Sequence, residues 1–241
     1  MTTEQKPGHE WTDAERVDQY VARMDAREDE ERRPFFEYMA RLIGAEPDAG
    51  LSVLDIGSGH GPVATVVLDA YPNAHAIGLD ISEAMIAVGR ERMARFGDRF
   101  RYMVGDFGDG KLPPEAVEAG PFDIVVSSRA IHHLSAELMA SLYAHIHENL
   151  RPGGSFFNLD TASAETDAMR ERYRAARRAE HPEDVRPASA SNEPRHTDAF
   201  PHHRDATLIR HLGWLKAAGY AAYDCFYKKG DRALIGGFKA A

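Results

Sequence analysis

The chain has 241 residues, of which 43% are hydrophobic and 28% are charged, a balance that is ordinary for a folded globular protein. Its formal net charge of -9 argues against a large nucleic-acid footprint, because such a footprint requires a basic face. A single cysteine excludes an intramolecular disulfide, and no apolar run approaches membrane-spanning length. The polar N-terminal residues are unlike a signal peptide, so we expect a cytoplasmic protein without a membrane partner.

Residues 1–50 are expected to form an N-terminal helical cap ahead of a main domain over residues 51–241. Apolar residues three and four positions apart predict helix over residues 11–45. The charged run over residues 25–33 is interpreted as a solvated helix face, because such side chains are usually exposed.

From residue 51 onward, short apolar runs alternate with helical patterns. Strands are predicted over residues 51–56, 74–80, 99–104, 122–127 and 155–159. Helices are predicted over residues 62–71, 83–96 and 135–150, with a loop over 108–120 that could include one helical turn, and a turn over 151–154. Strands that alternate with helices imply an α/β fold in which a parallel sheet is covered on both faces.

The alternation breaks over residues 161–204. A helix is predicted over residues 165–179, and the prolines that follow show no periodicity. So long an irregular insertion is usually either a functional lid or disordered, and we expect a lid-like segment. A helix over 206–218 then precedes two strands, 221–227 and 233–238, joined by a hairpin connection over 228–232.

The strongest local signal follows the first strand, where the sequence reads DIGSGHGP over residues 55–62. Glycines allow a tight turn and a close approach of the backbone to a ligand, and Pro62 suits the first position of a helix. The third glycine comes one position too early for the dinucleotide fingerprint. In addition, the carboxylate of Asp55 would repel a pyrophosphate and attract an ammonium or sulfonium group. The loop therefore fits a cationic ligand better than a dinucleotide.

Acidic side chains end the next two strands, where ligands bind in open α/β sheets. Asp80 ends the second strand and could accept hydrogen bonds from both hydroxyls of a ribose; alternatively, it is an acid favoured by a helix N-terminus. Ile81 and Met85 follow it and would pack against an adenine ring or simply belong to the core. Asp106 ends the third strand and could equally be a turn aspartate.

With these motifs in this order, residues 50–160 resemble the class I S-adenosylmethionine-dependent methyltransferases. Residues 53–61 are similar to the glycine-rich first motif of that family. The resemblance implies a Rossmann-like, doubly wound, mostly parallel seven-stranded sheet with an antiparallel C-terminal hairpin and helices on both faces. It also implies S-adenosyl-L-methionine as cofactor and S-adenosyl-L-homocysteine as product.

The resemblance assigns roles to individual residues. The methionine end of the cofactor would be held by the first motif, the ribose by Asp80 and the adenine amino group by Asp106. The backbone amide of Phe107 would serve the adenine ring. N-terminal helices cover the cofactor pocket in this family. Tyr20 would therefore reach the substrate, or it would only pack against neighbouring side chains. The remaining residues expected to bind cofactor are Asp55, Gly57, Ser58, Gly59, Gly61, Ile81, Met85 and Ser128.

The fourth strand is followed by His132 and His133, in a segment that lies beside the methyl group in the resembling family. A histidine can take up a proton near neutral pH and serve as a general base. Packing or helix capping is the simpler alternative. A metal site would need further ligands, such as His202 and His203, and we expect none.

Two further features have plain interpretations beside functional ones. Five arginines in the insertion could clamp an anionic group of the acceptor, although a solvated helix face is favoured. They are Arg170, Arg172, Arg174, Arg177 and Arg178. Cys225 lies among aromatic residues of a predicted strand and is interpreted as a buried structural thiol.

The sequence thus predicts methyl transfer from S-adenosylmethionine to a small-molecule acceptor. Three alternatives stay open. The acceptor could be RNA, which the acidic balance disfavours, or the chain could bind the cofactor without catalysis. A NAD(P)-dependent reductase is the third, and Asp55 with the shortened glycine spacing speaks against it.

Overall fold

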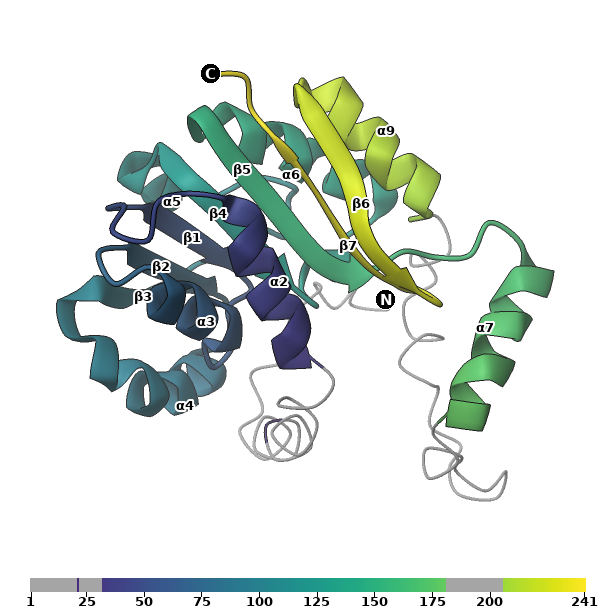
Figure 1. Ribbon diagram of the computed structural model, residues 1–241, viewed down its shortest axis with the longest axis horizontal. Coiled ribbons are helices and arrows are strands. Elements are labelled where there is room, and N and C mark those ends of the chain that lie inside the picture. The colour runs from purple at the N-terminus through teal and green to yellow at the C-terminus, as the bar shows by residue number, and fades with distance from the viewer. Residues whose placement is uncertain (1–20, 22–31, 181–205) are drawn as a thin grey trace, which may run out of the picture.

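A computed structural model describes Val21, residues 32–180 and residues 206–241, and its centre is a seven-stranded sheet (Figure 1). The strands are β1 (Ser52–Ile56), β2 (His75–Asp80), β3 (Phe100–Val104), β4 (Phe122–Ser128), β5 (Leu150–Thr161), β6 (Ala222–Lys229) and β7 (Arg232–Phe238). They lie in the order β3-β2-β1-β4-β5-β7-β6. Strands β1 to β5 pair in parallel, and β7 runs antiparallel to both β5 and β6. The predicted fold class is confirmed.

Helices cover both faces of the sheet (Figure 1). One face carries α2 (Arg33–Ile43), α3 (Pro62–Ala70) and α4 (Glu83–Met93), and the other carries α5 (Pro114–Ala119), α6 (Ala136–Glu148) and α9 (Leu208–Ala218). The alternation of side chains along β1 explains these layers, because neighbouring strand residues point to opposite faces. Val53 belongs to the core under α2 and α3, whereas Leu54 and Ile56 belong to the core under α6 and α9.

Helix α2 is the described part of the predicted cap. It begins with Pro34 in its first turn and ends at Gly44, which has the left-handed conformation typical of a helix C-terminus. Its buried residues Phe36, Met39 and Ala40 share one hydrophobic core with the sheet. The division of the chain at residue 50 stays a prediction.

Strand β5 differs from the sequence-based expectation. Residues 151–154 were expected to form a turn ahead of the strand, but they lie within one strand that runs from Leu150 to Thr161. Within the strand these residues form a bulge, because Leu150 pairs with Phe122 and Ser155 pairs with Ile124, and Gly153 has the left-handed φ of 74°. Lys239 donates from its backbone to the Gly154 carbonyl oxygen.

Two boundaries were also wrong. The helix expected to reach residue 96 ends at Met93, and residues Ala94–Arg99 form a 3-10 turn (η3) in which Gly97 has φ 54°. The C-terminal strands are longer than expected, so their connection is only Gly230-Asp231 rather than residues 228–232. A short hairpin connection favours glycine at positive φ, and Gly230 has φ 60°.

Helix α7 (Asp167–Glu180) matches the helix expected in the insertion and projects from the body of the protein (Figure 1). None of its residues is buried. The rest of the insertion, residues 181–204, lies outside the described residues, so its lid-like role stays a prediction.

Phe156 tests the core between β5 and α6. Its side chain is fully buried, and its ring lies 5.0 Å from that of Tyr143. Phe156→Ala leaves a cavity and is expected to lower the free energy of unfolding by about 3–5 kcal/mol, measured by urea denaturation. Ile209→Ala is the control, because Ile209 is 69% exposed and its loss should change stability by less than about 0.5 kcal/mol. Equal effects would contradict this account of the core.

Candidate functional site

The loop after β1 has the backbone that its glycines allow. Gly57 has φ 64°, and a Cβ added there would lie 2.1 Å from the Cβ of Ala130, so a side chain cannot fit. Gly59 has φ 54°, and an added Cβ would meet nothing within 4 Å. The loop is therefore packed tightly against Ala130 at Gly57 and open at Gly59, where a ligand can approach the backbone.

Asp80 binds this loop directly. Its Oδ2 accepts a hydrogen bond from the Gly59 amide at 2.7 Å, and its Oδ1 accepts one from the Ser82 amide at 2.8 Å. Burial raises the pKa of Asp80, although these backbone donors act in the opposite direction. Ser82 also caps α4 by accepting from the Met85 amide, so one carboxylate joins the glycine loop to the start of that helix.

Asp55 lies at the end of β1 with its carboxyl group completely buried. Its Oδ2 accepts a hydrogen bond from the Ala64 amide at 3.2 Å, whereas its Oδ1 has no donor among the described residues. Burial raises the pKa of Asp55 to about 8; Asp80 adds to this, and the Ala64 amide and Arg32 oppose it. A buried oxygen without a donor is costly, and a cationic group beside it would relieve that cost.

One pocket brings most of the predicted residues together. Those that line it are Asp55, Gly57, Ser58, Gly59, Asp80, Ile81, Met85, Asp106, Phe107, Ser128 and His133. Gly61 does not line it: an added Cβ there would lie 2.6 Å from the sulfur of Met93, so this glycine allows the loop to pack on α4. Tyr20 lies outside the described residues.

Arg32 lines the same pocket and was missed from the sequence. Its guanidinium donates from Nη2 to the Ser128 Oγ at 3.1 Å and lies over the ring of Phe36. Because this side chain is only 7% exposed, interpreting the whole charged run as a solvated face was wrong at Arg32. The missed signal was helical spacing, since Arg32 precedes the buried Phe36 by four positions and so shares its face.

Arg129 is the second arginine that the sequence analysis missed. It lines the pocket directly after β4 and has φ 56°, which is the left-handed region. A residue with a Cβ is strained there, and such strain is typical of functional sites. The sharp change of direction at Arg129 brings the following turn, η4 (Ile131–His133), against the pocket.

The two histidines have different surroundings. His133 lines the pocket, whereas His132 does not. The Nδ1 of His132 lies 2.7 Å from Oδ1 of the buried Asp160 at the end of β5. Helix α6 is capped by Ser135, which accepts from the Leu138 amide, so helix capping does not explain the histidines.

Asp106 has features both of a turn aspartate and of a cofactor-binding residue. Its Oδ1 accepts from the Gly108 amide at 2.7 Å, as in a turn, and the exposed side chain also lines the pocket. In the described ranges, no group of three His, Cys, Asp or Glu side chains could hold a metal ion. His202 and His203 lie outside the described residues.

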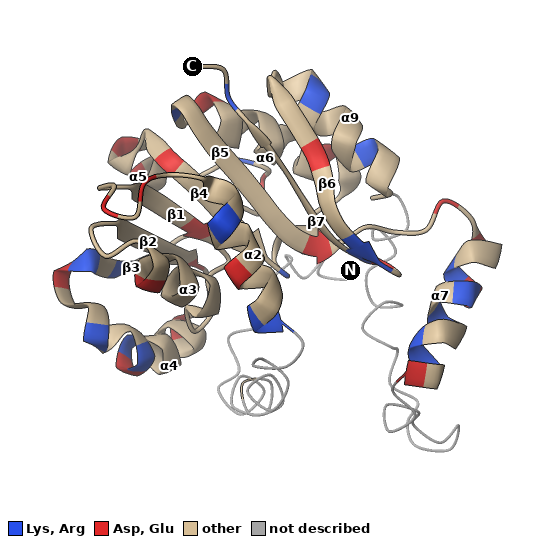
Figure 2. Cartoon of the chain, in the orientation of Figure 1, with Lys and Arg blue, Asp and Glu red and all other residues tan. Residues whose placement is uncertain are grey.

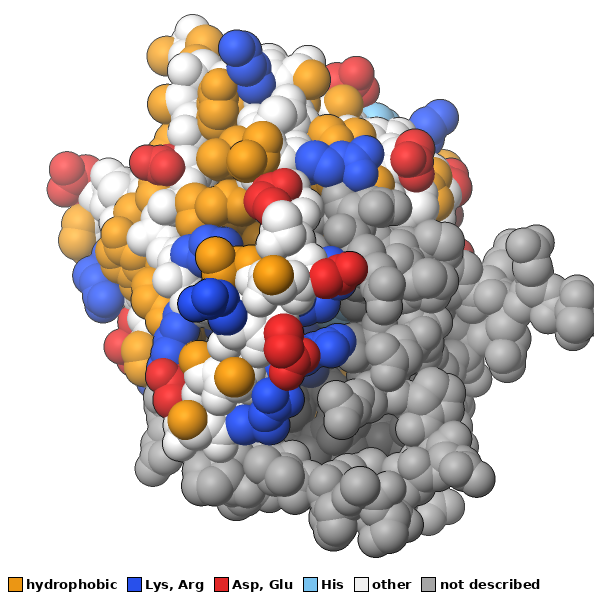
Figure 3. All heavy atoms as spheres, turned by 90° about the vertical axis from the view of Figure 1, so that its right-hand side faces the viewer, with side chains coloured by type: hydrophobic (Ala, Val, Ile, Leu, Met, Phe, Trp, Pro, Cys, Tyr) orange, Lys and Arg blue, Asp and Glu red, His pale blue; other side chains and the backbone are white. Residues whose placement is uncertain are grey.

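The arginines of α7 have acidic neighbours. Arg170 pairs with Asp167, and both Arg174 and Arg178 pair with Glu171. Arginines run along α7 with a few acidic residues among them (Figure 2), and both kinds of side chain occur on the face that carries it (Figure 3). These contacts agree with a solvated helix face.

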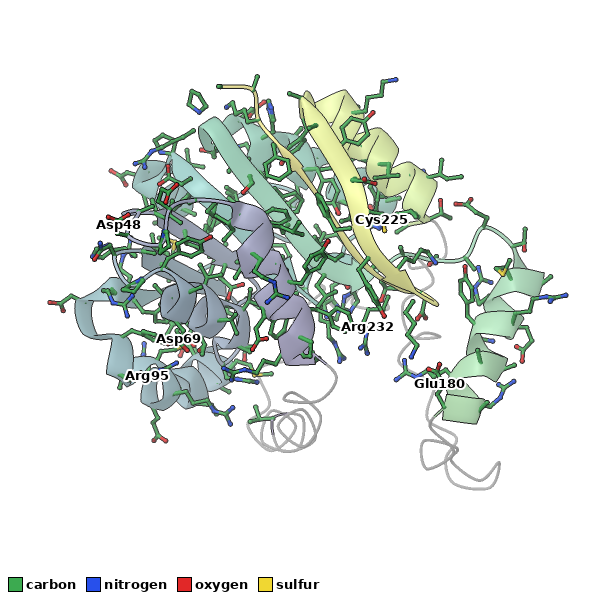
Figure 4. The ribbon with its side chains drawn as sticks, viewed as in Figure 1. Asp48, Asp69, Arg95, Glu180, Cys225 and Arg232 are labelled. Carbon is green, nitrogen blue, oxygen red and sulfur yellow. The ribbon has the colours of Figure 1, made fainter. Side chains whose placement is uncertain are left out.

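Cys225 lies on β6, the last strand of the sheet (Figure 4). Its side chain is half-buried rather than buried as expected, because β6 has a neighbouring strand on one side only. The thiol donates to the Tyr227 carbonyl oxygen at 3.2 Å, and burial raises its pKa. No described helix is long and apolar enough to cross a membrane.

Comparison with known proteins agrees with this fold and site. A methyltransferase-domain family model matches residues 53–154. An uncharacterized methyltransferase of Geobacillus is 29% identical over 168 residues, which cover 70% of this chain and 72% of the relative.

Two solved structures show the same fold. The pyocyanin biosynthetic protein PhzM is 22% identical with a TM-score of 0.59, over 85% of this chain and 54% of PhzM. PigF, determined with S-adenosyl-L-homocysteine, is 19% identical with a TM-score of 0.62, over 95% of this chain and 60% of PigF. The chain therefore spans little more than half the length of these two proteins.

The chain thus contains a methyltransferase domain and has the fold of the class I S-adenosylmethionine-dependent methyltransferases. Its cofactor is S-adenosyl-L-methionine. The residues of the pocket fit this cofactor. The glycine loop is open at Gly59, and the Oδ1 of Asp55 could accept a hydrogen bond from the ammonium group of the cofactor.

The raised pKa of Asp55 predicts how stability depends on pH. Below the ordinary pKa of 3.8, the carboxyl group is protonated in both the folded and the unfolded chain. Between 3.8 and about 8, only the unfolded chain releases the proton, so the free energy of unfolding falls as pH rises through this window. Each pKa unit corresponds to about 1.4 kcal/mol, so the loss should reach roughly a few kcal/mol.

Asp55→Asn keeps the size of the side chain and cannot ionise. Without cofactor, this variant is expected to melt at a higher temperature than the parent at about pH 8, and the difference should shrink toward about pH 5. Thermal unfolding at several pH values measures it. Asp106→Asn is the control, since its carboxyl group is exposed and its loss should change melting little. A constant difference between Asp55→Asn and the parent across this range would contradict the prediction.

Proposed function

We propose that this methyltransferase transfers the methyl group of S-adenosylmethionine to a small-molecule acceptor in the pocket beside the glycine loop. The observation that carries the proposal is the convergence of Asp55, Asp80 and Asp106, from the ends of three parallel strands, on one pocket. Ligands of open α/β sheets bind at such strand ends.

We assign the methionine end of the cofactor to the glycine loop, Asp55 and Arg32. The Oδ1 of Asp55 would accept from the ammonium group, which satisfies the oxygen that otherwise has no donor. The guanidinium of Arg32, which already reaches Ser128, would bind the carboxylate of the methionine portion. Each charged group of the zwitterionic methionine portion would thus meet a side chain of opposite charge.

We assign the nucleoside to the ends of β2 and β3. The carboxylate of Asp80 accepts from the backbone amides of Gly59, Ser82 and Ile81 and has about four lone-pair sites, so it can still accept from a ribose hydroxyl. Ile81, Met85 and Phe107 would pack against adenine, and Asp106 would accept from its amino group. All four line the pocket.

Asp80→Ala tests this assignment. Hydrogen bonds to a charged group contribute roughly 1.5–3 kcal/mol each, so affinity for S-adenosyl-L-homocysteine should fall by roughly tenfold or more in calorimetry. Asp69→Ala is the control, because Asp69 pairs with Arg95 at 2.6 Å outside the pocket (Figure 4). An Asp80→Ala affinity within about twofold of the parent would refute the assignment.

The reaction is an in-line displacement in which no side chain of the protein needs to form a covalent bond. S-adenosylmethionine, when bound, supplies a methyl group activated by its sulfonium. Holding donor and acceptor in line can contribute on the order of 7–11 kcal/mol to the rate. If the acceptor is a hydroxyl, His133 would take up its proton, because of the two histidines only His133 lines the pocket.

His133→Ala is therefore expected to lower turnover by about 10² to 10⁴. The pH–rate profile should also lose an inflection near the usual imidazole pKa of about 6.5. His75→Ala is the control, because His75 is exposed at the start of β2 and lies outside the pocket. An unchanged rate and profile in His133→Ala would show that His133 does no chemistry.

A small acceptor is favoured over RNA by the net charge of -9, since RNA binding requires a basic face. PhzM, which shares the fold, takes part in the biosynthesis of a small molecule, pyocyanin. Labelled methyl groups from the cofactor should therefore enter a metabolite extract and not purified RNA. Label in RNA alone would overturn the acceptor class, and binding without transfer would indicate a catalytically silent protein.

A further inference from the structure

Asp160 is a buried carboxylate that does not line the pocket, yet it contacts the turn that does. It lies near the end of β5, and its side chain is only 2% exposed in its pair with His132. Its Oδ2 accepts from the His132 backbone amide at 3.1 Å, and its Oδ1 lies 2.7 Å from the His132 Nδ1. Oδ1 also accepts from the Thr161 amide at 2.8 Å.

We propose that Asp160 is a positioning residue that, through His132, holds His133 against the pocket. This inference rests on the proposed role of His133 in the reaction. Asp160 reaches the turn from β5, whereas the turn itself continues from β4, so the contact fixes the turn from a neighbouring strand.

The charge of Asp160 determines that the ring nitrogen of His132 facing it, Nδ1, carries a hydrogen. Burial by itself raises the pKa of this carboxyl group, but the charge of His132 and the hydrogen bonds from His132 and Thr161 outweigh it and lower the pKa to about 2. An ionised carboxylate can only accept, so the Nδ1 of His132 carries the hydrogen. Two bonds to one residue, one from the backbone and one from the ring, leave His132 little freedom to rotate.

His132 passes this constraint to its neighbour by packing. The ring centroids of His132 and His133 lie 4.2 Å apart with an interplanar angle of 34°. On the other side of the turn, Ala130 packs so closely on Gly57 that no Cβ could be added there. The turn is thus held at both ends, by the glycine loop and by Asp160, with His133 presented to the pocket between them.

The far side of Asp160 faces the protein interior. The charge of Asp160 acts on Tyr143 and His211, and these two side chains are hydrogen-bonded to each other at 2.9 Å. Burial raises the pKa of Tyr143 and lowers that of His211 to about 4, so both are neutral at neutral pH. Of these three side chains, His132 is the one that contacts Asp160 through both its backbone amide and its ring.

The test compares Asp160→Ala with Asp123→Ala. Asp123 also accepts two hydrogen bonds near a strand terminus, from the Ser52 amide and from Arg151, but at the opposite end of β4 from the pocket. The probe is S-adenosyl-L-homocysteine, added to protein labelled in its histidine rings, and the readout is the NMR shift of the His133 ring. His133→Ala identifies that signal.

In the parent and in Asp123→Ala, the probe is expected to shift the His133 signal. In Asp160→Ala the shift should become much smaller, while affinity for the probe stays within about threefold because Asp160 does not line the pocket. Turnover in Asp160→Ala should fall by roughly 10- to 100-fold, since a misplacement of about 1 Å costs this much.

Asp160→Asn separates positioning from loss of stability. It keeps an oxygen that accepts from the His132 Nδ1, but it sets a donor against the His132 amide, so we expect a shift between those of the parent and the alanine variant. A full-sized His133 shift in a folded Asp160 variant, whether Asn or Ala, overturns the inference and leaves the proposed function intact. A parent that does not bind the probe refutes the proposed function instead.

Discussion

The pocket depends first on the carboxylate of Asp80. One oxygen binds the Gly59 amide in the loop after β1, and the other binds the Ser82 amide at the start of α4. Both donors are backbone groups, so this single side chain at the end of β2 fixes the relative position of two segments from different strands. It adds a hydrogen-bonded link to the packing of Gly61 on Met93, and so ties the open side of the glycine loop to α4, whose Met85 lines the same pocket.

Charge in this pocket is arranged for a ligand and not for the stability of the empty protein. Burial raises the pKa of both Asp55 and Asp80, which shows that ionising these groups works against folding. Arg32, which lines the same pocket, offsets part of that cost at Asp55. A zwitterionic ligand with its own ammonium and carboxylate groups would complete the balance, and this is the physical basis of the proposed cofactor site.

The residues beyond the cofactor site show how neighbouring strands cooperate. The backbone at Arg129 turns sharply after β4, and Asp160 on β5 holds the resulting turn through His132. Residues on adjacent parallel strands end at the same edge of the sheet, so they can act on one another although 28 positions separate His132 from Asp160 in the chain. The two histidines consequently have different surroundings despite being adjacent in sequence.

The sequence by itself determined the layered α/β fold, the glycine loop and the order of acids at the strand ends, because periodicity, glycine spacing and strand ends are local signals. Only the tertiary structure decided three other matters. It started β5 at Leu150 rather than at residue 155, because Leu150 pairs with Phe122 across a bulge at residues 151–154. It buried Arg32 beside Ser128 and paired Asp160 with His132. Those contacts join residues 96 and 28 positions apart, and local patterns carry no information about which distant side chains will meet.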